Sequence, residues 1–158
     1  MIKHGPLTFE YSKITPRIFI GTNQCCITHF EGELIMKGVY ADLSLEHEKI
    51  DAAWGAKYFL WLPVKNNTAP TLKQFILGVS FIKHCVNNDL KVYVHCKRGH
   101  GRAPTMVAAY LVAINGMTPH EAFAFIKKRR KVVHPNKGQM AAVKKYAAFA
   151  KRNGSKAH

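Results

Sequence analysis

The feature that most restricts the fold of this 158-residue chain is a short turn between an apolar strand and a helix. Residues Lys91 to Val94 predict a buried strand, and Arg102 to Ile114 predict a helix with one apolar face. Between them, Gly99 and Gly101 permit tight backbone geometry. A strand that runs directly into a helix is typical of α/β folds, in which ligands bind beyond the carboxyl ends of the strands.

Strand and helix signals alternate along the rest of the chain. Further strands are expected over residues 8–11, 17–20, 39–43 and 58–64, and further helices over 27–36, 71–82, from 118, and over 137–151. Thr71 and Thr118 are the expected N-caps of two of these helices. The predicted fold class is therefore α/β, with a central, mainly parallel sheet of four to five strands flanked by helices. We expect a single domain over residues 1–158, with a core from about residue 14 to 150.

The net charge of +15 is concentrated in the C-terminal part, because seven of the nine acidic residues lie within the first 51 positions. The densest basic run is Lys127 to Lys131. Such charge favours anionic partners, namely phosphorylated molecules, an anionic membrane surface or nucleic acid, although a solvated helix face is an equal alternative for the run itself. Nucleic acid is the least favoured partner, because no aromatic side chains interleave with the run.

The four cysteines, Cys25, Cys26, Cys85 and Cys96, have the spacing of neither a disulfide framework nor a zinc site. The nine histidines show no ligand spacing either, so no metal is expected. Free thiols indicate a reducing compartment, which places the protein in the cytoplasm, with a peripheral position at membranes as an extension. No window is apolar enough to span a membrane, and the N-terminus resembles no secretory signal.

The turn itself carries the chemistry. Glycines let successive backbone N–H groups converge on an anion, and the next helix adds the positive end of its dipole. Arg102 can give a phosphoryl group two parallel hydrogen bonds, and the same field favours the nucleophilic thiolate of Cys96. His95 would orient the turn from behind. The expected phosphate-binding residues are Lys97, Arg98, Gly99, His100, Gly101 and Arg102. An ordinary buried cysteine is the alternative for Cys96, but the surrounding residues argue against it.

The pattern His95-Cys96-x-x-Gly99-x-Gly101-Arg102 resembles the signature of the cysteine-dependent tyrosine and dual-specificity phosphatases. The resemblance extends from about Ile14 to Tyr146. Among subgroups, the chain is most similar to the phosphatidylglycerophosphate phosphatases of mitochondria, plants and bacteria, through residues 45–48, 94–97 and 105–111. The resemblance to this family implies hydrolysis of a phosphomonoester through a phosphocysteine on Cys96, with no cofactor.

Two positions depart from this family. The aspartate that acts as general acid in the family falls on Asn66, or on Lys65 in another alignment. The hydroxyl residue that usually follows the signature arginine is replaced by Ala103. Since general acid catalysis contributes about 10²–10⁴-fold, both departures are expected to slow turnover while leaving phosphate binding intact.

Three explanations stay open for the missing acid. Another carboxylate replaces it, with Glu46, Glu48 and Asp51 as candidates, although an ordinary solvated acidic loop is the simpler interpretation of these residues. Alternatively, the substrate has a good leaving group, or the protein chiefly binds phosphorylated ligands. Asn66 could also be an engineered replacement that traps substrate.

We expect a monomeric phosphatase acting on a polyanionic phospholipid, inositol or similar phosphate, because Lys97 and Arg98 lie inside the turn and His100 would add charge if protonated. A phosphotyrosine or dual-specificity protein phosphatase is the first alternative. A catalytically impaired phosphate-binding protein is the second, and a phosphatase of RNA 5′ ends is the third. Cys85 or the Cys25–Cys26 pair could form a disulfide with an oxidised Cys96, but they are more simply explained as bystanders.

Overall fold

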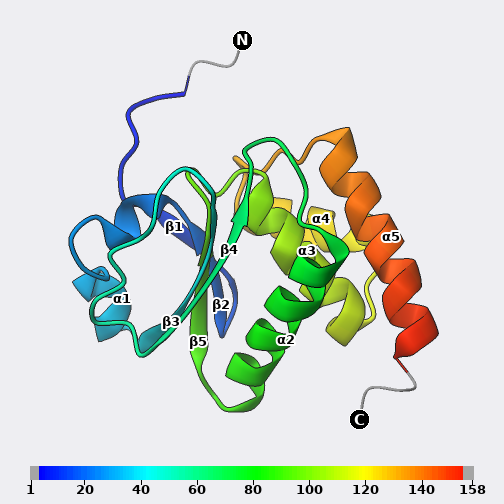
Figure 1. The fold of residues 1–158 in the computed structure, drawn as a ribbon, viewed down its shortest axis with the longest axis horizontal. Coiled ribbons are helices and arrows are strands. Elements are labelled where there is room, and N and C mark those ends of the chain that lie inside the picture. The colour runs from blue at the N-terminus through cyan, green and yellow to red at the C-terminus, as the bar shows by residue number, and fades with distance from the viewer. Residues whose placement is uncertain (1–3, 155–158) are drawn as a thin grey trace.

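The computed structural model describes residues 4–154, which form one five-stranded sheet with helices on both sides (Figure 1). The strands are β1 (Tyr11–Thr15), β2 (Ile18–Gly21), β3 (Val39–Glu46), β4 (Tyr58–Val64) and β5 (Lys91–His95). The helices are α1 (Gly32–Met36), α2 (Leu72–Asn87), α3 (Arg102–Asn115), α4 (Pro119–Arg129) and α5 (Lys137–Asn153), and a 3₁₀ helix, η1, spans Asn23–Cys26.

The strand order is β1-β2-β5-β3-β4. β1 and β2 form an antiparallel hairpin, whereas the β2–β5, β5–β3 and β3–β4 pairs are parallel. The predicted α/β class with a mainly parallel sheet is therefore confirmed. β5 is the central strand and is covered on both sides, which explains its continuous apolar sequence.

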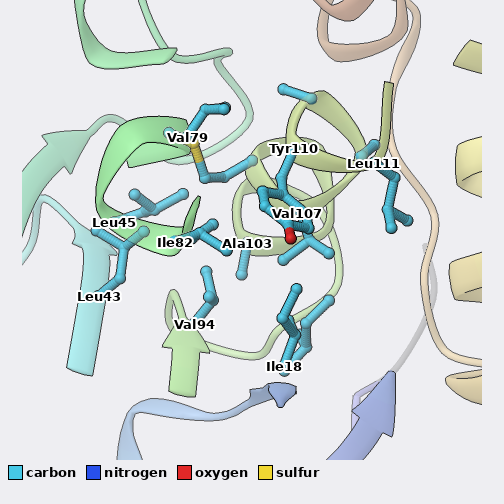
Figure 2. Close-up of a cluster of buried hydrophobic side chains, with 14 of the residues drawn as sticks. Ile18, Leu43, Leu45, Val79, Ile82, Val94, Ala103, Val107, Tyr110 and Leu111 are labelled. Atoms are coloured by element: carbon cyan, nitrogen blue, oxygen red, sulfur yellow. The ribbon is translucent and has the colours of Figure 1, made fainter. Parts of the chain in front are cut away.

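The two faces of the sheet are covered unequally. On one face, α2, α4 and α5 pack around α3 and form the larger core, which Figure 2 shows in part. On the other face, η1 and α1 cover a smaller apolar cluster around Phe30 and Tyr93. Residues 102–111 of α3 are all buried, so the start of this helix is fixed by the core. Each fully buried aliphatic side chain there contributes about 1.5–3 kcal/mol.

The helix starts are set by local hydrogen bonds. The hydroxyls of Thr71 and Thr118 each accept a hydrogen bond from the backbone N–H three residues on. The side chains of Gln74 and Glu121 accept in turn from the N–H groups of the two caps, so both predicted caps are confirmed. Within the described part of the chain, no helix combines the length and the apolar character needed to cross a membrane.

The N-terminal part departs most from the sequence-based expectation. β1 starts at Tyr11, where the predicted strand ended, and the predicted helix over 27–36 is helical only from Gly32. The preceding residues instead cross to a distant loop, since the Phe30 N–H donates to the Trp54 carbonyl. Cys25 and Cys26 form a disulfide between neighbours, so the expectation that all four cysteines are free thiols is wrong for this pair.

Candidate active site

The turn between β5 and α3 forms one wall of a cavity of about 240 Å³. Cys96 and Arg102 both line it, together with the loop after β4 and the first residues of α5. Cys96 is buried and carries a free thiol. The cavity lies at the carboxyl end of β5, where ligands bind in parallel α/β sheets. The nucleophile and the arginine predicted from sequence thus share one pocket.

The backbone of the turn explains its glycines. Gly99 has φ of +69°, a conformation that side chains disfavour, and a Cβ there would lie 2.7 Å from the Gly21 carbonyl oxygen. A Cβ at Gly101 would lie 3.0 Å from the side-chain amide of Gln139. Gly101 is also the N-cap of α3 and provides no capping side chain. The first N–H groups of a 14-residue helix therefore remain available to an anion in the cavity.

Arg130 holds this turn from behind. Its guanidinium is buried and donates to the carbonyls of Gly99 (2.9 Å) and Arg98 (2.8 Å), and it pairs with Glu10 at 2.6 Å. Carbonyls directed at Arg130 point away from the cavity, which favours inward-facing N–H groups. From the sequence, Arg130 was expected only as part of the basic surface run. The other residues of that run are exposed, and the Arg129 guanidinium lies over the Phe125 ring.

Arg102 is fixed by two partners. Its Nη1 donates to the Val64 carbonyl at 2.7 Å and to the two carboxylate oxygens of Glu48 at 3.1 and 3.0 Å. The arginine side chain is 2% exposed, whereas that of Glu48 is 38% exposed. Burial raises the pKa of Glu48, but the hydrogen bonds from Arg102 and the backbone outweigh this and hold that pKa below its ordinary value. Glu48 is therefore an ionised partner that orients Arg102.

His95 lies in a buried cluster of charges beneath the turn. Its Nε2 is 3.2 Å from Asp42 and 2.8 Å from Asp51, and its Nδ1 is 3.3 Å from the Cys96 carbonyl oxygen. Burial disfavours the charged ring, but Asp42 and Asp51 outweigh it and raise the pKa of His95 well above its ordinary value. For the carboxyl group of Asp42, burial has the opposite effect and raises the pKa. The His95 imidazolium can thus donate from Nδ1 to the Cys96 carbonyl and anchor the start of the turn.

None of the three surrogate acids lines the cavity, as far as the described residues show. Asp51 pairs with His95, and Glu46 accepts hydrogen bonds from Asn23 at 2.8 and 3.0 Å. Burial raises the pKa of Glu46, and the hydrogen bonds from Asn23 hold its carboxyl group outside the cavity. Only Glu48 reaches the turn, through Arg102. The structure therefore gives the members of this acidic segment supporting positions and not the place of the general acid.

The loop after β4 contributes Asn66 and Asn67 to the cavity wall, whereas Lys65 is absent from it. Of the two alignments of the family's general acid, the structure thus favours Asn66. Ala103 is fully buried, and the Thr105 hydroxyl donates to the Gly101 carbonyl at 2.7 Å. The Thr105 hydroxyl is therefore engaged with the backbone at the start of its own helix.

Lys97, Arg98 and His100 all line the cavity. Lys97 is exposed, and Arg98 donates to the Gly5 carbonyl at 3.2 Å. Burial and nearby cations lower the pKa of His100 to about 4. His100 is therefore neutral at pH 7, and the extra positive charge considered for it is absent.

Several cavity residues were missed by sequence reasoning. Asn136 and Gln139 form the capping box of α5, and they also donate to the carbonyls of Asn67 (2.8 Å) and Thr68 (3.0 Å). They thereby fix the loop after β4 against α5. The Asn-x-x-Gln spacing could have revealed the cap, but not this second role, which depends on contacts between distant segments.

The remaining cysteines offer no reactive thiol in this structure. Burial raises the pKa of Cys85 to about 11, so this thiol is unreactive at neutral pH. In the disulfide-bonded state seen here, Cys25 and Cys26 have no thiol to offer an oxidised Cys96. The structure thus favours the bystander interpretation of all three.

Comparison with known proteins agrees with this geometry. Residues 18–149 match the family model described as the dual specificity phosphatase catalytic domain. Rat dual specificity protein phosphatase 5 is 34% identical over 109 residues, which cover 68% of this chain and 28% of that protein. Human phosphatidylglycerophosphatase and protein-tyrosine phosphatase 1 is 40% identical over 77 residues, 49% of this chain and 38% of that protein. The match thus spans well under half of each of these relatives.

Solved structures share the fold. The crystal structure of PTPMT1 in complex with PI(5)P superposes with a TM-score of 0.79 at 23% identity, covering 91% of this chain and 98% of that chain. Human DUSP28 gives a TM-score of 0.80 at 21% identity over 94% and 97% of the two chains. The family model covers most of the chain, including the cysteine turn and all of the larger core's helices up to residue 149. The chain belongs to the dual specificity phosphatase family.

Proposed function

We propose that this protein hydrolyses phosphomonoesters through a phosphocysteine on Cys96. One observation carries the proposal: the free Cys96 thiol shares its cavity with Arg102 and with the uncapped start of α3. A phosphoryl group bound to these donors lies against the sulfur. The thiolate attacks phosphorus, the S–P bond forms and the P–O bond to the leaving group breaks. Water then cleaves the S–P bond and releases phosphate.

Among residues 4–154, no carboxylic acid lines the cavity that could protonate the leaving oxygen. Asn66 stands where the family has its general acid, and its amide cannot supply the proton. Glu48 is hydrogen-bonded to Arg102. We infer that the enzyme acts fast only on esters with good leaving groups and slowly on alkyl phosphates. Glu48 is a positioning residue in this scheme, because it contacts Arg102 and not the reacting atoms.

The proposed substrate is a polyanion, such as a phospholipid or inositol phosphate. Lys97 and Arg98 line the cavity and can attract charge beyond the scissile phosphate. The relatives named for phosphatidylglycerophosphatase activity support this choice, and so does the PTPMT1 complex with PI(5)P at the level of the fold. The net charge of +15 suits an anionic membrane surface, where such lipids reside.

A protein phosphatase is the second candidate, favoured by relatives such as dual specificity protein phosphatase 5. The third is a phosphate-binding protein without turnover, favoured by Asn66 and Ala103. The retained thiol argues against the third, because binding alone needs no nucleophile.

The test is steady-state hydrolysis of an aryl phosphate by the wild type, Cys96→Ser and Cys85→Ser. Cys85 is the matched control, because it is a second buried free thiol that lies outside the cavity. We expect a loss of at least about 10⁴-fold for Cys96→Ser, as for other removed nucleophiles, and a nearly unchanged rate for Cys85→Ser. Wild-type protein that binds inorganic phosphate but shows no turnover would reject the enzyme in favour of the binding protein.

Substrate class is tested separately, with a phosphoinositide in vesicles against a phosphotyrosine peptide. Lys97→Gln should lower kcat/KM for the phosphoinositide more than for the peptide. Lys144→Gln, an exposed lysine on α5 outside the cavity wall, should change neither. Equal losses on both substrates would argue for the protein phosphatase.

A further inference from the structure

Three histidines that are far apart in the sequence meet at the cavity. His4, His100 and His134 each place one ring nitrogen within 4.8 Å of those of the other two. Their ring centroids are 4.9–6.0 Å apart. All three line the same cavity as Cys96. Sequence spacing predicted no such cluster, because each histidine comes from a different segment.

Hydrogen bonds fix two members of this histidine cluster. The His134 N–H donates to the His100 carbonyl at 2.9 Å, which joins the two backbones directly. The Nδ1 of His134 lies 2.7 Å from the Val132 carbonyl oxygen, a contact that requires a proton on Nδ1. In the neutral ring, Nε2 then carries a free lone pair. The N-terminal segment bearing His4 is attached to the turn through Arg98 and the Gly5 carbonyl.

This arrangement discriminates between ligands. A second phosphate needs hydrogen-bond donors, and a lone pair on Nε2 of His134 would repel it. A metal ion needs that lone pair, and metal-bound histidines commonly donate their other ring N–H to a backbone carbonyl.

We propose that His4, His100 and His134 form a binding site for a divalent transition-metal ion of the Zn²⁺ type at the mouth of the active-site cavity. Three imidazoles with one open coordination position are a known donor set for zinc. With Zn–N distances of about 2.0–2.1 Å, ligand nitrogens in a tetrahedral site lie about 3.3–3.4 Å apart. The three donor atoms lie within 4.8 Å of one another, so binding requires them to approach by up to about 1.5 Å, chiefly through movement of the exposed His4 side chain.

Cations near the site oppose metal binding, and two of them, Arg98 and Arg130, are engaged with other groups. Arg130 is paired with Glu10, and Arg98 donates to the Gly5 carbonyl. A bound phosphoryl group would add negative charge beside the ion. Because the ion would occupy the entrance to the cavity that contains Cys96, it inhibits hydrolysis. That last consequence rests on the proposed phosphatase function, whereas metal binding itself does not.

The first test is calorimetric titration of the untagged full chain with Zn²⁺, repeated with Co²⁺ to record ligand-field spectra. We expect one site whose affinity falls more than about 10-fold in His4→Ala and in His134→Ala, since even outer-shell partners are worth about 10–100-fold. His120→Ala is the matched control, because His120 is exposed on α4 and lies outside the cavity wall. Equal affinity in all three variants would overturn the proposal.

Cys96→Ser separates the histidine cluster from an adventitious thiolate site. The proposal expects unchanged affinity and no thiolate-to-Co²⁺ charge-transfer band. Binding lost in Cys96→Ser but kept in His134→Ala would overturn it. So would weaker binding of inorganic phosphate by metal-free His134→Ala, which would identify the cluster as a phosphate subsite.

Inhibition is measured last, as the rate of aryl phosphate hydrolysis with Zn²⁺ relative to the same variant without metal. The wild type and His120→Ala should be inhibited at metal concentrations that leave His134→Ala active. If the protein has no phosphatase activity, the calorimetric and spectroscopic results still decide the metal site. Metal binding without inhibition would overturn the placement at the cavity mouth.

Discussion

The two walls of the active-site cavity differ in what they retain. The turn from Cys96 to Arg102 has a nucleophile, an arginine and a backbone fixed by Arg130. The loop after β4 is fixed equally well, through Asn136 and Gln139, but it presents amides where the family uses an acid. Phosphate binding needs only the first wall, whereas transfer to a poor leaving group needs both. The comparison shows that binding and proton donation are separable in this fold.

Restoring the acid should give the largest effect. Asn66→Asp is expected to raise kcat on alkyl phosphates by about 10²–10⁴-fold, the usual contribution of a general acid. The gain should be far smaller on an aryl phosphate, whose leaving group needs little protonation. Steady-state rates over a series of leaving groups measure this.

Asn67→Asp is the matched control for this change. Asn67 is adjacent, lines the same cavity and has φ of +63°, a conformation that aspartate also tolerates. Equal responses of the two variants would mean that added negative charge, and not a positioned proton donor, is responsible.

Removing the support of the first wall should affect stability. Arg130→Met leaves Glu10 and the carbonyls of Arg98 and Gly99 without their donor. The Glu10 side chain is 48% exposed and can be hydrated, but each buried carbonyl left without a donor costs about 1–3 kcal/mol, so the free energy of unfolding in urea should fall by about 2–4 kcal/mol. Arg129→Met, at the exposed neighbouring position, removes the contact with the Phe125 ring and an exposed hydrogen bond to the Phe125 carbonyl, and should cost less than about 1 kcal/mol. Similar costs for both would contradict the assigned role of Arg130.

Arg102→Lys tests the geometry of the first wall. Lysine keeps the charge but loses the planar fork that holds Val64, Glu48 and a phosphoryl group together. We expect kcat/KM on an aryl phosphate to fall by about 10²–10³-fold, as when one fixed donor to a developing charge is removed. A loss below tenfold would show that charge alone is sufficient.

The parts of the site and of the fold that could be predicted from the sequence are those whose residues are close together in the chain. Cys96, Arg102 and the two glycines lie within seven consecutive residues, so their spacing alone placed them in one strand-turn-helix unit. The helix starts at Thr71 and Thr118 were equally local. Local signals are interpretable because the residues that interact are neighbours in the chain.

The misses have a common physical cause. Arg130 contacts residues 31, 32 and 120 positions away, and its burial could not be distinguished from a solvated basic run. Residues 27–31 have helical periodicity but instead cross towards Trp54. The histidine cluster likewise joins three distant segments. Contacts between segments far apart in the sequence decide all three features, and the composition of a short stretch of sequence does not reveal such contacts.

Glu48→Gln should give the smallest effect and bears on how the two walls are joined. The carboxylate is partly exposed, so its pairing with Arg102 is expected to contribute less than about 1 kcal/mol to stability. Because pairing lowers the pKa of Glu48, this contribution is present above the ordinary glutamate pKa and is lost as pH falls through the lower folded value. The unfolding free energies of wild type and Glu48→Gln should therefore differ at pH 7 and converge in acid. A difference that persists in acid would show that the glutamine disturbs packing. A difference absent at pH 7 would mean that the Val64 carbonyl alone is enough to hold Arg102, and Glu48 would then be dispensable to the stability of the site.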